Sequence, residues 1–138
     1  MKIKNILITL GLALLSFNVL AGLTQPAEVE VDLEIRFAQG DMKTARNSPN
    51  EFAFIGCGIR KIAISPTEIF SFGFCQANVG EVEDGGITCF TENPELLAAI
   101  DAISDYSYVT FSWDEAEECT RIGNSTQSFY LPRLKEKK

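Results

Sequence analysis

Histidine is absent from the 138 residues, which removes the commonest general base and the usual partner of a serine or cysteine nucleophile. Positive charge is also scarce, with 12 lysines and arginines against 19 aspartates and glutamates. The resulting net charge of −7 disfavours nucleic acid as a partner, because phosphate binding needs clustered cations. These absences argue against a nucleophilic hydrolase and against a nucleic-acid-binding protein.

Long apolar runs are confined to the N-terminus. Lys2 and Lys4 precede the apolar stretch 6–15, and Val19 and Ala21 then fit the small-residue positions of a cleavage site. This order predicts a signal peptide over residues 1–21 and not an anchor, since a membrane span needs about 20 consecutive apolar residues. Loss of both lysines would change the net charge from −7 to −9. We therefore expect a secreted or periplasmic protein without a membrane span after cleavage, with one domain over 22–132 and a charged tail over 133–138.

The cysteines are few and widely spaced. They are Cys57, Cys75, Cys89 and Cys119, and an even number in an exported domain predicts two disulfides. No CxxC pair occurs, and without histidine a zinc site is disfavoured. We therefore predict no metal and no cofactor.

Hydrophobic patterning predicts mostly strands. Residues 28–37 alternate strictly between apolar and charged side chains, which predicts one half-buried strand, and the polar stretch 39–50 predicts a loop. Asn93 followed by Pro94 predicts the start of a helix that continues to about Ser104, with an apolar stripe containing Leu96 and Ile100. Further strands are expected over 51–64, 68–79, 106–113 and 119–131, which makes five in all, and 87–90 is a candidate for an additional short strand.

The turn at Pro66 gives a testable strand register. A hairpin centred on Pro66 places Cys57 opposite Cys75, near the distance at which a disulfide forms. This register favours Cys57–Cys75 with Cys89–Cys119, although a bulge at Gly56 or Gly58 would shift it.

Together these elements predict an α+β fold that is mainly β, with one helix between the third and fourth strands. That order fits an OB-like five-stranded barrel, and an open five-stranded antiparallel sheet with a helix on one face is the alternative. Both arrangements place the helix against first-strand residues such as Leu33 and Ile35, through Leu96, Ile100 and Ile103.

Part of the chain resembles a group of small secreted bacterial proteins with no assigned activity. The similarity lies in Gly-Phe-Cys at 73–75, Cys-Phe-Thr at 89–91, Ser-Tyr-Val at 107–109, Cys119 and Ser-Phe-Tyr-Leu-Pro at 128–132. It covers roughly residues 73–132. The resemblance implies an exported domain and supplies no catalytic or binding residue.

Two kinds of side chain are candidates for a site. The acidic clusters at 81–84 and 114–118 lack the spacing of an EF-hand loop, which favours solvated turns over calcium sites. The stripe of Phe70, Phe72 and Phe74 is predicted to face the core, with a ligand groove as the alternative. Aromatic and polar residues on the last two strands could bind a sugar or peptide. That candidate binding surface consists of Tyr106, Tyr108, Trp113, Asn124, Thr126, Gln127 and Tyr130.

The sequence thus favours an exported, non-enzymatic module that binds a protein, peptide or glycan. A small hydrolase with paired carboxylates is a second hypothesis, and it requires a pocket that holds two acids. A third is an inhibitory or structural protein that inserts a loop, such as 80–86, into its partner.

Overall fold

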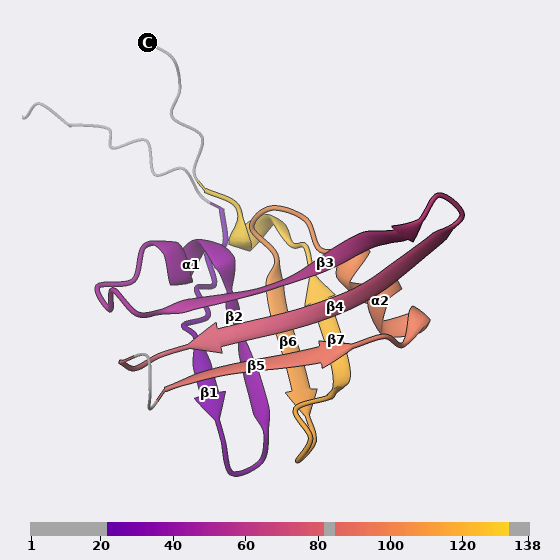
Figure 1. Ribbon diagram of the computed structural model, residues 1–138. Coiled ribbons are helices and arrows are strands. Elements are labelled where there is room, and N and C mark those ends of the chain that lie inside the picture. Colours follow the sequence, from indigo (N-terminus) through magenta and orange to yellow (C-terminus); the bar gives the residue numbers. More distant parts are fainter. Residues whose placement is uncertain (1–21, 82–84, 133–138) are drawn as a thin grey trace, which may run out of the picture.

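The computed structural model describes residues 22–81 and 85–132 (Figure 1). The predicted signal peptide, the charged tail and part of the acidic loop 80–86 lie outside the described residues. The elements in chain order are β1 (Glu30–Asp32), β2 (Phe37–Asp41), α1 (Met42–Arg46), β3 (Phe54–Ser65), β4 (Glu68–Asn78), β5 (Gly86–Thr91), α2 (Pro94–Asp101), β6 (Tyr108–Trp113), β7 (Cys119–Ser125) and the 3-10 turn η1 (Ser128–Tyr130).

The strands form two antiparallel sheets. One has the order β1-β2-β6-β7 and the other the order β3-β4-β5. In Figure 1 the three-stranded sheet runs across the four-stranded one, and the core that both sheets cover contains the fully buried Ala38, Val109 and Phe111. The mainly β character is confirmed, whereas the single five-stranded sheet and the OB-like barrel are wrong.

The five-stranded prediction was wrong partly because of the N-terminal segment. The predicted strand 28–37 is a hairpin, because the chain reverses between β1 and β2. The Asp32 carboxylate accepts the N–H groups of Glu34 and Ile35, each at 3.0 Å, and Arg36 adopts a φ of 55°. Consequently Leu33 and Ile35 are 53% and 69% exposed at the turn and do not contact α2 as predicted.

The segment 39–50 was predicted as a loop, which is also wrong. It contains the end of β2 and the short helix α1, whose N-cap is Asp41. One oxygen of the Asp41 carboxylate accepts the N–H of Thr44 at 2.7 Å, and the other accepts that of Ala27 at 2.6 Å. Asp41 is 1% exposed, so both bonds are shielded from water.

The β3–β4 hairpin has the predicted register. Cys57 pairs directly with Cys75, and the irregularity lies near Ala63 and Ser65 instead of at the glycines. Both predicted disulfides, Cys57–Cys75 and Cys89–Cys119, are confirmed. The second one joins β5 to β7 and therefore connects the two sheets. Cys75 also lies opposite Cys89 in the β4–β5 register, so the two disulfides are neighbours.

Helix α2 begins where the sequence predicts. The Asn93 side chain accepts the N–H groups of Glu95 and Leu96 at 2.9 and 3.3 Å, and Pro94 follows it. The helix ends at Asp101, one turn earlier than predicted. It packs closely on β4, because a Cβ atom at Gly73 would lie 2.5 Å from Ile100 Cδ1.

The C-terminal half is partly as predicted. β6 buries Val109, Phe111 and Trp113 on one face, as its alternation indicates. The predicted strand 119–131 is too long, because β7 ends at Ser125 and Tyr130 belongs to η1. No helix in the described part of the chain has the length and apolar character needed to cross a bilayer.

Candidate functional site

The seven residues of the predicted binding surface do not form one surface. Trp113 and Tyr130 are 7% and 8% exposed, so both belong to the interior and cannot offer their rings to a ligand. Trp113 packs against the Phe111 ring, with 5.8 Å between centroids, on the core face of β6. Its inclusion in a binding surface was wrong, because alternation separates the two faces of a strand without showing which one is buried.

Three other members of that set hold elements together. Asn124 Nδ2 donates to the carbonyl of Ala99 at 3.1 Å, which fastens β7 to α2. The Thr126 hydroxyl, just after β7, lies 3.0 Å from the hydroxyl of Ser104, just after α2. The Tyr108 ring stacks on that of Tyr130, and its hydroxyl donates to Gln39 Oε1. The exposed members of the set are Tyr106, Thr126 and Gln127.

The two tyrosines of the Tyr108–Tyr130 stack have raised pKa values. Burial raises the pKa of Tyr108 above 10.0, and the charges of Tyr130 and Glu30 raise it further. Burial, followed by the charge of Asp41, also raises the pKa of Tyr130. The folded state therefore holds these protons to higher pH than the unfolded chain does.

We expect the free energy of unfolding to be insensitive to these two groups below about pH 10 and to fall as the pH rises further. The Tyr108→Phe variant should lose less stability over that range. Urea unfolding at a series of alkaline pH values, with tyrosinate absorbance as a second signal, measures both effects. If the free energy of unfolding falls equally steeply with pH in both proteins, Tyr108 is not the group responsible.

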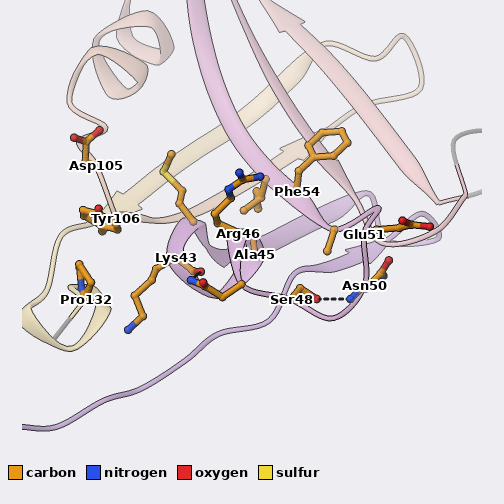
Figure 2. A pocket seen from close by; sticks show the side chains of 14 residues that line it. Lys43, Ala45, Arg46, Ser48, Asn50, Glu51, Phe54, Asp105, Tyr106 and Pro132 are labelled. Carbon is orange, nitrogen blue, oxygen red and sulfur yellow. Dashed lines mark hydrogen bonds between the residues drawn. The ribbon is translucent and has the colours of Figure 1, made fainter.

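An open pocket of about 920 Å³ lies between α1 and the start of β3 (Figure 2). Lys43 and Arg46 of α1 contribute cations, Phe54 and Tyr106 contribute exposed apolar surface, and Ser48 and Asn50 belong to the connecting loop. Lys43 Nζ lies 3.3 Å from the carbonyl oxygen of Leu131, to which it donates. We refer to this site as the α1 pocket.

The α1 pocket bears on the hydrolase hypothesis, because it contains the carboxylates of Glu51 and Asp105. Figure 2 shows them at opposite ends of the pocket, and both residues are exposed to solvent. A paired-carboxylate mechanism requires the two groups to face one reacting bond.

Within 22–81 and 85–132, no group of three or more cysteines, aspartates and glutamates is arranged to hold a metal ion.

The hairpin β3–β4 extends beyond the rest of its sheet. β5 pairs with β4 only over Gly73–Asn78, so residues 60–72 project as a two-stranded arm (Figure 1). We call this segment the arm. Its isoleucines Ile62, Ile64 and Ile69 are 50%, 61% and 60% exposed, and they cover both faces of the arm near its turn.

The phenylalanine stripe lies at the base of the arm and faces outward. Gly73, Cys75 and Ala77 are buried on one face of β4, so Phe70, Phe72 and Phe74 lie on the opposite face and are only half-buried. The prediction that this stripe faces the core was wrong. The Arg60 guanidinium lies 4.8 Å from the centre of the Phe74 ring and covers it.

A groove runs along the free edge of β4, where β5 has ended. Its apolar lining comes from Phe70, Phe72, Phe90 and Leu96, and its volume is about 740 Å³. The rings of Phe72 and Phe90 are 6.3 Å apart, and Phe90 is 47% exposed. We call this site the β4-edge groove.

The acidic turn after β6 forms one wall of the β4-edge groove. The N–H of Phe90 donates to the carbonyl of Glu117 at 2.9 Å, and Asp114 accepts the N–H groups of Ala116 and Glu118 at 2.9 and 3.0 Å. This turn brings Glu118 beside the groove, where Glu92 also lies. The sequence indicated Glu118, within the acidic cluster 114–118, but it did not place Glu118 beside the phenylalanine stripe or identify Glu92. The short strand 87–90 beside the longer strand 68–79 was a signal that part of β4 would lack a neighbour.

No protein family model, curated protein or solved structure matches this chain. The geometry of its own residues therefore carries the functional argument.

Proposed function

We propose that this chain is an exported, non-enzymatic interaction module that binds a partner protein through the arm. Export is supported by the N-terminal pattern at residues 1–21 and by two disulfides, which are compatible with an oxidising compartment. The absence of histidine and the pairing of all four cysteines support a passive role. The proposal moves the binding surface from the last two strands to the β3–β4 hairpin.

The exposure of Ile62, Ile64 and Ile69 is the observation that carries the proposal. Three large aliphatic side chains at one end of an acidic protein are costly to leave in water, at roughly 25 cal/mol for each Å² of apolar area. Large apolar side chains that gather in the exposed part of a fold are typical of interaction sites. The arm also projects from the body of the protein, so a partner can contact both of its faces (Figure 1).

The arm proposal predicts a selective loss of partner binding in the variant Ile62→Ser/Ile69→Ser. The chain from Gly22 onward is immobilised, incubated with the culture medium and periplasmic extract of the producing cells, and the captured partner is identified and titrated. We expect affinity to fall at least tenfold, since burying one such side chain contributes about 1.5–3 kcal/mol. The thermal midpoint should barely change, because both side chains are already exposed.

The matched control is Leu33→Ser/Ile35→Ser. These residues are 53% and 69% exposed at the β1–β2 turn, away from the arm. The control should bind the partner with unchanged affinity. Equal affinity of the arm variant and the unmodified protein would refute the proposed function.

A further inference from the structure

We infer that the β4-edge groove receives an extended, cationic segment of the partner, which adds to the sheet as a strand beside Glu68–Phe72. This inference rests on the proposed function, since it names the part of the partner that reaches the base of the arm. It depends on three observations: an unfilled strand position, an apolar lining and the distribution of charge along the two edges of the arm.

The strand position follows from the lengths of the strands. β4 pairs with β3 from Glu68 to Asn78, but with β5 only from Gly73 onward. Within the described residues, β5 is the only strand on that side of β4, and the chain turns into α2 after Thr91. The backbone groups of residues 68–72 that point to this side are therefore available to another strand, as at any sheet edge.

The lining of the groove suits alternate side chains of an added strand. Phe70 and Phe72 project from β4 itself, whereas Phe90 and Leu96 come from the end of β5 and from α2. An added strand presents every second side chain to one face, so its apolar residues would contact these rings while its backbone pairs with β4. In strand addition, the backbone hydrogen bonds supply affinity and the side-chain pockets supply selectivity.

Charge distinguishes the two edges of the arm. The β3 edge carries Arg60 and Lys61, and cationic side chains on an edge strand are a common protection against unwanted pairing. The β4 edge carries Glu68, and Glu92 and Glu118 line the groove, with no lysine or arginine among the residues that line it. The unprotected edge is thus the acidic one, and it favours a segment in which lysine or arginine alternates with aliphatic residues.

The test uses three synthetic peptides of equal length. The first alternates lysine with isoleucine or valine, the second replaces each lysine by glutamate, and the third repeats the first with N-methyl groups on alternate amides. We expect the first to bind at least tenfold more tightly than the other two, since N-methylation removes the backbone donors and keeps the charge. Hydrogen exchange of the amides of residues 68–72 should slow with the first peptide alone.

The variant Glu92→Lys/Glu118→Lys should bind the first peptide about tenfold more weakly, because it reverses two charges beside the groove. Glu34→Lys/Asp101→Lys is the matched control, since both of those acids are exposed outside the groove, and it should bind normally. Equal binding of the methylated and unmethylated peptides, or no effect of Glu92→Lys/Glu118→Lys, would overturn strand addition.

Size-exclusion chromatography of the protein alone separates a further outcome. Concentration-dependent self-association that Glu92→Lys/Glu118→Lys abolishes would show that a second copy fills the groove, which also overturns the inference. Failure here is distinguishable from failure of the proposed function. If partner capture depends on Ile62 and Ile69 while all three peptides bind alike, the arm remains the docking surface and only strand addition is wrong.

Discussion

Replacing Cys89 and Cys119 together by alanine is expected to lower the free energy of unfolding by about 4 kcal/mol. The two residues are 30 positions apart, so the disulfide removes much of the conformational freedom of the unfolded chain. It also joins β5 of one sheet to β7 of the other. Because Cys89 and Cys119 are 0% and 5% exposed, removal of their sulfur atoms also leaves a small void between the sheets.

The matched control is Cys57→Ala/Cys75→Ala, which removes the disulfide within the β3–β4 hairpin. Its separation is 18 residues, and the strand pairing that surrounds it persists without the disulfide. We expect a loss of about 3 kcal/mol. Urea unfolding of both variants measures the difference, and an equal or larger loss for the hairpin variant would contradict the view that the bond between the sheets is the more important one.

Asp41→Ala is expected to lower the free energy of unfolding by about 3 kcal/mol, since it removes two hydrogen bonds to a buried carboxylate. It leaves the N–H groups of Thr44 and Ala27 without their acceptor, one at the start of α1 and one in the segment that precedes β1. Hydrogen exchange should therefore accelerate at both amides, in addition to the global loss of stability.

Asp32→Ala is the control for Asp41→Ala. The Asp32 carboxylate also accepts two backbone N–H groups, those of Glu34 and Ile35, but it is exposed at the β1–β2 turn. Water can replace it there, so we expect a loss of at most about 1 kcal/mol. If Asp32→Ala and Asp41→Ala lower the free energy of unfolding equally, burial does not explain the contribution of Asp41.

The features predicted correctly from the sequence are those set by local geometry. A turn at Pro66 determines which residues of its hairpin are opposite, so the Cys57–Cys75 disulfide follows and the second disulfide is left by elimination. Asn93 determines the start of α2 through hydrogen bonds within one turn, and Pro94 does so through its fixed φ. Neither inference requires knowledge of distant contacts.

The wrong predictions concern features that tertiary contacts determine, such as strand boundaries and the buried face of a strand. Alternation over 28–37 suits one strand, but the Asp32 carboxylate stabilises a reversal that lets β2 pair with β6. Alternation in β4 separates Phe72 from Cys75 without showing which side faces the second sheet. The position of that sheet depends on β2 pairing with β6, two segments about 70 residues apart, and on no local signal.

The candidate site was predicted only in part, because a ligand groove at the phenylalanine stripe was the alternative and not the favoured interpretation. The β4-edge groove results from a difference in length between β4 and β5, combined with the contact between Phe90 and the turn at Glu117. The arm was visible in part, since Ile62, Ile64 and Ile69 flank the predicted turn. Their exposure could not be predicted from the sequence, because it depends on how far the second sheet extends.

The row of four half-cystines has a consequence for biosynthesis. Since Cys75 faces Cys57 on one neighbouring strand and Cys89 on the other, a nascent β4 can close either link without leaving its sheet. Before Cys89–Cys119 has closed, the Cys89 thiolate can attack the Cys75 sulfur of the first bridge and release the Cys57 thiolate, and the reverse attack restores the correct bridge. Maturation would consequently depend on sulfur exchange as well as on thiol oxidation.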